Sequence, residues 1–303
     1  MKRYSFLLVL LVLFAACKRK NTGVTEIEES RTTGSVKILV DASFDDIVSD
    51  QIEVFQSDYP ASKFDIITGN ENKILPTFLN DSVRVIIMSR VLTKQEEQAY
   101  VKRSIPIYTQ RFAIDGIALI TDAAEQDSTI TADEVIAILK GTSTSGKSLV
   151  FDNPYSATVG YFKALANITE LPKKGVYTLQ TNTDVIKFVA TNKNYIGVVG
   201  VNWVLEGNKN TAAYLPKIKL LGVKNVKGKK GDDAFYKPDQ KNLISGIYPF
   251  LRNVYIINCE GKEGLGTGFA NWLASPRGQL IVLRSGLGPH KIISRDFNLK
   301  NTN

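Results

Sequence analysis

Short apolar runs of strand length alternate with helix-like segments along most of this 303-residue chain, which narrows the folds it can adopt. The run 36–40 is a strand candidate, and the apolar run 195–200 is another. Between such runs apolar residues recur at helical spacing, as they do at Phe44, Val48, Ile52 and Phe55. Chains of this kind form layered domains in which helices cover a sheet. The alternation therefore predicts an α/β fold.

Several of the expected helices begin at a recognisable cap. Segments 93–96 and 131–134 fit the capping box, in which two side chains bond each other's backbone N–H groups. The second of these helices is expected to stop at Lys140-Gly141, a cation followed by a glycine. Near the C-terminus, the sequence predicts a helical region over 269–284 with an interruption at Ser275-Pro276.

The first 17 residues have the pattern of an export signal. Basic residues at 2–3 precede an apolar run at 6–14, and Ala15-Ala16 precede Cys17. A transmembrane helix needs about 20 apolar residues, so this run is too short to be one. The last residues before Cys17 resemble the bacterial lipobox, in which the cysteine is acylated and becomes the new N-terminus. We expect removal of residues 1–16 and a lipid anchor on Cys17; an ordinary secretory signal with an incidental cysteine is the alternative.

We expect the next segment to tether the protein to a membrane. The anchored protein would face the periplasm. Residues 17–34 would form this flexible tether, because they are polar and rich in Thr, Glu and Ser. Loss of Lys2 and Arg3 with the signal lowers the formal charge from +8 to +6. The remaining basic residues form no arginine–aromatic stripe or zinc-finger spacing, so we expect no nucleic-acid partner.

Residues that carry the common hydrolytic chemistries are scarce. His290 is the single histidine, and no serine-elbow signature lies near it. Cys259 is the one cysteine besides Cys17; it follows an apolar run and is expected to be buried. No Cys/His cluster has the spacing of a metal site. We therefore expect no catalytic residue, no metal and no cofactor.

One loop matches the spacing of a nucleotide-binding phosphate loop. Four residues separate Gly141 from Gly146-Lys147-Ser148. The context differs, because this loop follows an expected helix and precedes a strand-like run, whereas the phosphate loop joins a strand to a helix. An exported protein also meets no cytoplasmic ATP. We interpret the segment as a Ser/Gly-rich loop.

Polar residues at expected strand ends and helix starts form a more informative set. Backbone N–H groups and hydroxyls at helix starts bind anions, and an arginine adds a bidentate donor for tetrahedral oxyanions. The candidate ligand-binding residues are Ala42, Ser43, Phe44, Ser89, Arg90, Asp115, Asp152, Ser156, Ala157 and Thr158. Taken singly, each is a common helix cap or strand end, so the information lies in their order.

In this order the segments resemble the phosphate-binding receptors of ABC transporters, a periplasmic binding protein family (type II) with two lobes. Segment 42–44 is similar to the family's Ala-Thr-Phe phosphate loop, and 156–158 to its Ser-Gly-Thr helix start. Segment 88–96 is similar to its Ser-Arg-x-Leu-x-x-x-Glu motif, and 114–118 to its crossing strand. The resemblance extends over about 36–293, with later matches at 195–200, 248–252 and 275–279.

The chain departs from the family pattern at two charged positions. Many members carry an arginine four residues before the Ser-Gly-Thr motif, where this chain has Asp152, and Ala157 replaces the glycine. Some members place an aspartate where Arg90 stands. Relative to those members, the positive and the negative charge would have exchanged positions in this chain. The hypothesis is that Arg90 supplies the cation while Asp152 accepts a proton from a protonated oxyanion.

The resemblance implies two α/β lobes joined by crossing hinge strands, one from residues 35–112 with 246–303 and the other from 113–245. It implies capture of inorganic phosphate, or a similar tetrahedral oxyanion, and its delivery to an ABC permease without bond chemistry. Two alternatives stay open. One is a lipoprotein that has lost phosphate binding and acts as a sensor or scaffold, or binds another small ligand. The other is an exported hydrolase.

Overall fold

The computed structural model describes residues 28–205 and 210–291. Residues 1–16 and Cys17 lie outside the described residues, so the export signal and the lipid anchor stay predictions. Within the described ranges, no helix is both long enough and apolar enough to cross a membrane.

The strands pair along one path, in the order β2-β1-β3-β11-β4-β8-β6-β7. Strands β9 and β12 also pair with β4, and β10 pairs with β5 in a separate small sheet. The strands are β1 (Gly34–Asp41), β2 (Ser62–Gly69), β3 (Val85–Met88), β4 (Tyr108–Asp122), β5 (Thr129–Thr131), β6 (Ser148–Phe151), β7 (Val176–Thr178), β8 (Tyr195–Gly200), β9 (Ile218–Leu220), β10 (Gly222–Lys224), β11 (Leu251–Asn258) and β12 (Gly288–Pro289). Parallel pairs lie toward both ends of the path, and antiparallel pairs join them in the middle.

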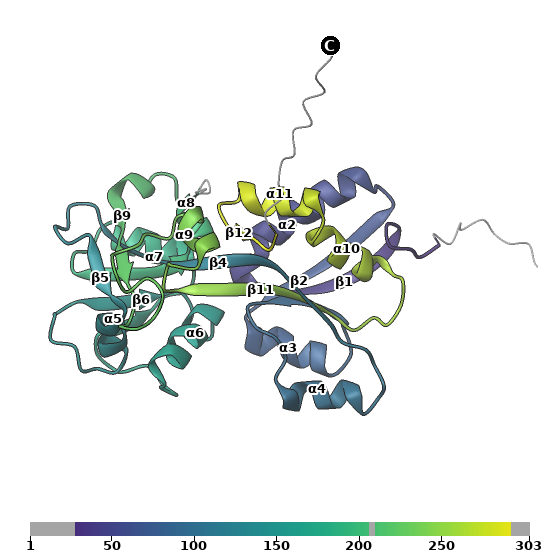
Figure 1. Ribbon diagram of the computed structural model, residues 1–303, viewed down its shortest axis with the longest axis horizontal. Coiled ribbons are helices and arrows are strands. Elements are labelled where there is room, and N and C mark those ends of the chain that lie inside the picture. Colours follow the sequence, from purple (N-terminus) through teal and green to yellow (C-terminus); the bar gives the residue numbers. More distant parts are fainter. Residues whose placement is uncertain (1–27, 206–209, 292–303) are drawn as a thin grey trace, which may run out of the picture.

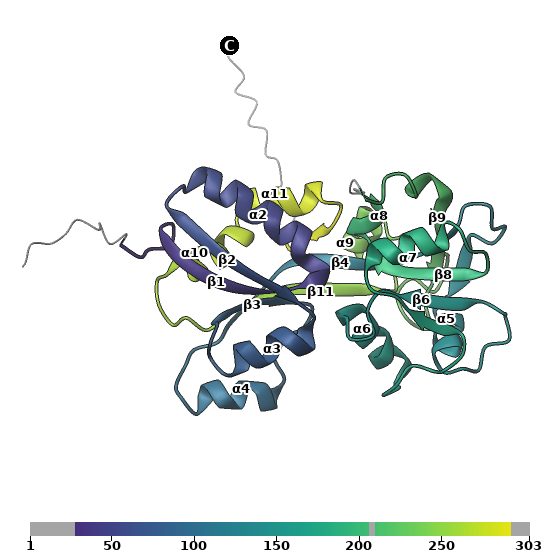
Figure 2. The same cartoon turned by 180° about the vertical axis from the view of Figure 1, so that it is seen from behind.

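The helices cover the strands and divide into two bodies (Figure 1). In the first lobe, α2, α10 and α11 lie on one side of strands β1–β3, and α3 and α4 lie on the other. In the second lobe, α7 to α9 and α5 with α6 lie on opposite sides of β6–β8 (Figure 2). The helices are α2 (Asp45–Asp58), α3 (Glu71–Leu79), α4 (Lys94–Val101), α5 (Ala132–Leu139), α6 (Ala157–Ala166), α7 (Asn182–Val189), α8 (Asn202–Leu205), α9 (Gln240–Ser245), α10 (Leu265–Leu273) and α11 (Pro276–Arg284).

Two long strands, β4 and β11, run side by side from one lobe into the other (Figure 1). Strand β11 pairs antiparallel with β3 and with residues 108–116 of β4, and β4 continues into its pairing with β8 through residues 117–120. The crossing strand expected at 114–118 is thus part of β4. The α/β fold with crossing strands is confirmed.

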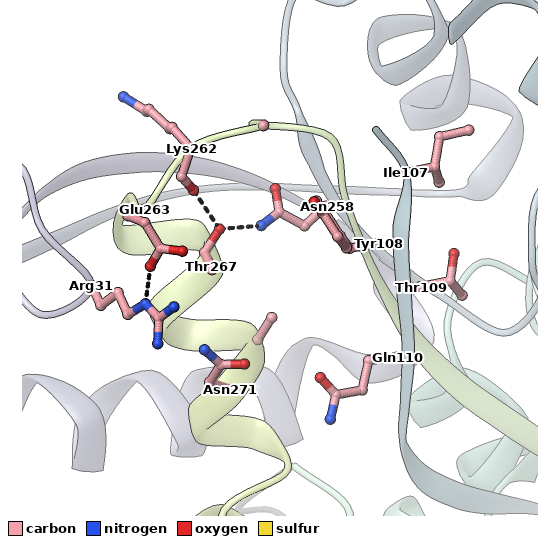
Figure 3. Close-up of a pocket in the computed structure, with 12 residues that line it drawn as sticks. Arg31, Ile107, Tyr108, Thr109, Gln110, Asn258, Lys262, Glu263, Thr267 and Asn271 are labelled. Atoms are coloured by element: carbon pink, nitrogen blue, oxygen red, sulfur yellow. Dashed lines mark hydrogen bonds and ion pairs between the residues drawn. The ribbon is translucent and has the colours of Figure 1, made fainter. Parts of the chain in front are cut away.

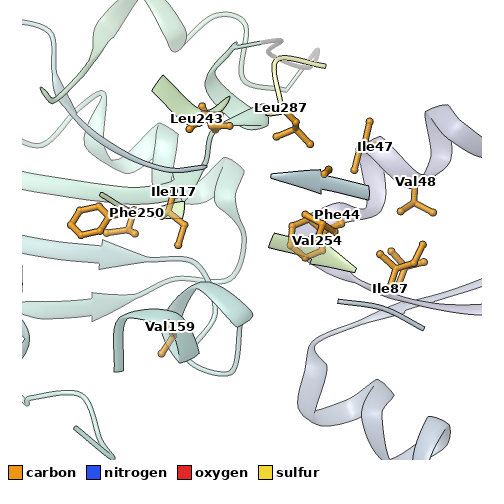
Figure 4. Close-up of a cluster of buried hydrophobic side chains, with 14 of the residues drawn as sticks. Phe44, Ile47, Val48, Ile87, Ile117, Val159, Leu243, Phe250, Val254 and Leu287 are labelled. Atoms are coloured by element: carbon orange, nitrogen blue, oxygen red, sulfur yellow. The ribbon is translucent and has the colours of Figure 1, made fainter. Parts of the chain in front are cut away.

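A hydrophobic cluster extends across the crossing strands into both lobes (Figure 4). Phe44 and Val254 belong to its first-lobe side, and Ile117 and Phe250 to its second-lobe side. All four side chains are almost completely buried. Burial of this kind contributes about 25 cal/mol for each Å² of apolar surface removed from water, so the cluster holds the crossing strands in a fixed position.

Local sequence signals for helix ends agree with the structure. Thr93 and Glu96 form the reciprocal capping box at the start of α4. At the start of α5 only half of the expected capping box forms: the Thr131 side chain accepts a hydrogen bond from the backbone of Glu134, and the Glu134 carboxylate accepts one from Ser143. The expected interruption near 275–276 separates α10 from α11: Ser275 caps α11, and a proline at the first helical position needs no backbone N–H.

The prediction of a flexible tether as far as Gly34 is wrong for its last residues. Arg31 forms an ion pair with Glu263, and Glu29 forms one with Lys262. A Cβ at Gly268 would collide with the carbonyl oxygen of Arg31, so the two backbones are in close contact. Residues 28–33 therefore lie against the first lobe, and β1 already begins at Gly34.

Candidate functional site

A buried ion pair joins the two crossing strands where they pass between the lobes. Arg252 of β11 lies opposite Asp115 of β4 in the antiparallel register. Both Nε and Nη2 of Arg252 donate to Oδ2 of Asp115, at 3.0 and 2.5 Å. Each side chain is only 2% exposed. Because a buried charge is costly without a partner, these two residues depend on each other.

The same arginine reaches the start of α6 in the second lobe. Its Nη1 donates to Oγ1 of Thr158, at 3.1 Å. Ser156 is the N-cap of this helix: its side chain accepts a hydrogen bond from the backbone of Val159 and donates one, at 2.6 Å, to Oδ1 of Asp152. Nδ2 of Asn182 lies 3.4 Å from Oδ2 of Asp152. The helix start predicted at 156–158 is confirmed, and its backbone N–H groups and helix dipole favour negative charge.

The first lobe contributes the end of β1 and the turn that follows. Asp41 is buried, and its Oδ1 accepts the backbone N–H of Ser43 at 2.9 Å, as a helix cap does. The buried ring of Phe44 lies under the guanidinium of Arg252, with 5.2 Å between the guanidinium carbon and the ring centroid. Ala42 is exposed. We call the following residues the Arg252 cluster: Asp41, Asp115, Asp152, Ser156, Thr158, Asn182 and Arg252.

Burial raises the pKa of each of the three carboxyl groups, Asp41, Asp115 and Asp152, because a buried carboxylate loses its hydration. The charge of Arg252 opposes this effect at all three. The charge of Asp152 also raises the pKa of Asp41, so the two carboxyl groups lie within electrostatic reach of each other. The cluster thus brings three carboxyl groups to one guanidinium.

Arg90 has other partners. Its Nε donates to Glu71 at 2.7 Å, and its Nη1 and Nη2 donate to Glu96 at 2.8 and 2.9 Å. The hydrogen bond from Arg90 is the main reason that the pKa of Glu96 falls to about 2. Two carboxylates thus occupy the nitrogens of Arg90, while the charge of Arg252 acts on Asp152, so the role of Arg90 as the cation for an oxyanion stays a prediction. Ser89 and Arg90 are both half-buried and follow β3.

Two surface cavities lie away from this cluster. One, of about 710 Å³, is lined by residues of the first lobe that include Arg31, Gln110 and Asn271 (Figure 3). The other, of about 580 Å³, borders the Ser/Gly-rich loop and includes Lys147. That loop follows α5 and precedes β6, as the sequence predicts. Neither cavity contains a predicted site residue.

Reasoning from the sequence missed Arg252 as a site residue and treated Asp41 only as a helix cap. Arg252 is the one charged residue of β11, where its neighbours on the same face include the buried Val254 and Ile256, and a lone charge in such a strand indicates a buried partner. The partner, Asp115, is 137 positions away in the chain. Among the described residues, no three His, Cys, Asp or Glu side chains gather closely enough to hold a metal ion.

Two α/β lobes, joined by crossing strands with polar side chains buried between them, define a two-lobed binding protein of the type II periplasmic class. The family model described as a PBP superfamily domain matches residues 25–277. The match covers more than half of the chain, so the chain belongs to this superfamily.

Several proteins to which this chain is similar come from phosphate transport. The phosphate-binding protein PstS of Pseudomonas aeruginosa is 23% identical over 269 residues, which cover 78% of this chain and 77% of the relative. An ABC-type phosphate transport receptor of Vibrio cholerae has a TM-score of 0.64 at 16% identity, covering 84% of this chain and all of that one. A Clostridium perfringens protein, assigned as a phosphate ABC transporter substrate-binding protein and solved with bound phosphate, has a TM-score of 0.67 at 19% identity and covers 85% of this chain and all of the other. At these identities the structural likeness establishes the fold.

Proposed function

We propose that this protein is an exported receptor that captures a small oxyanion of the phosphate type between its lobes and delivers it to an ABC permease, with no bond chemistry. Cys17 would carry the lipid anchor that keeps the receptor near its membrane partner. The relatives named above bind phosphate or serve phosphate transport, and the chain shares their fold.

One observation carries the proposal: Arg252 connects the crossing strand β11 to the N-terminus of α6 through Thr158. A guanidinium and a set of helix-start N–H groups therefore lie together, and both favour an oxyanion. Phe44 brings the start of the first-lobe helical segment to the same arginine. An anion bound here would contact both lobes, so its binding would favour the closed arrangement.

A second candidate function is a sensor or scaffold that binds no small anion. The observation in its favour is that Arg252 already uses Nε, Nη1 and Nη2 in bonds to Asp115 and Thr158. Small-angle scattering with and without oxyanions separates the two functions, because a receptor should become more compact on binding and a scaffold should not.

A thermal-shift screen of oxyanions tests the receptor function. A ligand that binds only the folded state at 100 times its Kd adds about 2.7 kcal/mol to the unfolding free energy. For a chain of this size that corresponds to a rise in melting temperature of about 5–10 °C. We expect at least one of phosphate, a phosphonate, arsenate or sulfate to give such a rise. If none raises the melting temperature at millimolar concentration, the receptor function is excluded.

A further inference from the structure

Three buried oxygen atoms of the Arg252 cluster accept no hydrogen bond from any residue that the structure describes. They are Oδ2 of Asp41, Oδ1 of Asp115 and Oδ1 of Asn182. The side chains that carry them are 1%, 2% and 8% exposed. Buried polar atoms are nearly always paired, so three unpaired acceptors in one cluster indicate donors supplied from outside the chain.

The cluster also contains more carboxyl groups than cations. Asp115 is paired with Arg252, but among the described residues Asp41 and Asp152 take part in no ion pair. Their bonds come from neutral donors: the Ser43 backbone for Asp41, and Ser156 with Asn182 for Asp152. A dianion entering this cluster would therefore meet one guanidinium, already neutralised, and two further carboxyl groups.

An unpaired donor lies near the same arginine. The indole Nε1 of Trp203 is buried and donates to no partner among residues 28–205 and 210–291. Trp203 and Arg252 both lie close to Gly200. A Cβ built on Gly200 would lie 3.4 Å from Cδ1 of Trp203 and 3.9 Å from Nη2 of Arg252. Donors for an oxyanion thus lie near Arg252 and Trp203. Of the unpaired acceptors, Oδ1 of Asp115 lies beside Arg252, and those of Asp41 and Asn182 lie near Asp152.

In the described part of the chain, no three His, Cys, Asp or Glu side chains gather closely enough to hold a metal ion, so we look for another kind of donor. The unpaired oxygen atoms could instead accept hydrogen bonds from donor groups carried on one small molecule. A molecule with an oxyanion at one end and an ammonium group at the other would satisfy both sets.

We propose that the ligand is a small zwitterion that joins an oxyanion to an ammonium group, as an aminoalkylphosphonate does. Its oxyanion would bind near Arg252 and the start of α6, and its ammonium group would donate to Asp41 and Asp152. This inference rests on the proposed function, and it names the class of ligand for the same site.

Titration calorimetry with matched ligands tests the inference on the unmodified protein. The ligands are 2-aminoethylphosphonate, ethylphosphonate, ethylamine and inorganic phosphate, at pH 7. We expect 2-aminoethylphosphonate to bind at least about tenfold more tightly than ethylphosphonate or phosphate, since one well-formed charge pair corresponds to about a factor of ten in Kd. Ethylamine alone should bind far more weakly.

Two conservative variants locate the ammonium group. D152N and D41N each remove a negative charge and keep the shape, so each should reduce the preference for 2-aminoethylphosphonate over ethylphosphonate. D65N is the matched control, because Asp65 is half-exposed and pairs with Lys37 on the surface. The preference should be unchanged in D65N.

The outcomes separate this inference from the proposed function. If ethylphosphonate or phosphate binds as tightly as 2-aminoethylphosphonate, the zwitterion is wrong and the oxyanion receptor stands. If ethylamine binds as tightly as 2-aminoethylphosphonate, the oxyanion contributes nothing and the inference is overturned. If none of the oxyanions binds, the proposed function fails and this inference fails with it.

Discussion

Replacement of Arg252 by methionine is expected to lower the unfolding free energy by about 3–5 kcal/mol, because breaking a buried ion pair leaves the other charge without a partner. Asp115 would keep its buried position between β4 and β11 and lose both bonds from the guanidinium. For a chain of this length the loss corresponds to a fall in melting temperature of about 10 °C. Thermal unfolding followed by circular dichroism measures it.

Two controls make this result specific. R277M removes a surface arginine that pairs with Asp58 and is 59% exposed, and it should cost less than about 1 kcal/mol. The double variant D115N/R252M removes both charges, so it should be more stable than R252M alone. A shift in R252M no larger than the shift in R277M would contradict the account of the ion pair.

Truncation of Phe162 to alanine should cost about 3–5 kcal/mol, the usual range for a buried phenylalanine. Phe162 is completely buried in α6 and packs against Phe151 and Phe250, with ring centroids 5.5 and 5.0 Å away. Phe250 immediately precedes β11, so these rings fix the start of α6 relative to Arg252. Chemical denaturation measures the cost, and the same variant should bind the ligand more weakly.

Two further variants are controls for F162A: one keeps more apolar volume at the same position, and the other changes an exposed aromatic residue nearby. F162L keeps most of the apolar volume and should cost clearly less than F162A. Y155A changes an aromatic residue in the loop before α6 that is 65% exposed, and it should leave stability nearly unchanged. Equal stability of F162A and Y155A would show that the ring packing does not hold α6 in place.

Much of the fold was predictable because its signals are local. Thr93, Thr131 and Ser156 mark helix starts through side chains that bond the backbone three residues on, and the structure shows each of these bonds. The apolar run 195–200 is β8, a strand buried in the sheet. The end of the tether was not predictable in this way, because Glu29 and Arg31 are held by side chains more than 230 positions away.

The candidate site was only partly predictable, for the same reason. Asp115 and Thr158 were found through short motifs, but their common partner, Arg252, comes from a strand that meets them only after the chain has folded. Arg90 stands in a motif that indicates an anion contact, yet Glu71 and Glu96 occupy its nitrogens. The register of the sheet determines which arginine lies beside Asp152. No local sequence pattern encodes that register.

Titration calorimetry on three proteins tests the central claim, that an oxyanion binds at Arg252 and the start of α6. The titrant is the tightest binder among phosphate, ethylphosphonate and 2-aminoethylphosphonate, and the proteins are the wild type, T158V and R90Q. T158V removes the hydroxyl that holds Nη1 of Arg252 and should weaken binding by about tenfold, whereas R90Q should stay within about twofold of the wild type. Loss of binding in R90Q with unchanged binding in T158V would contradict the account.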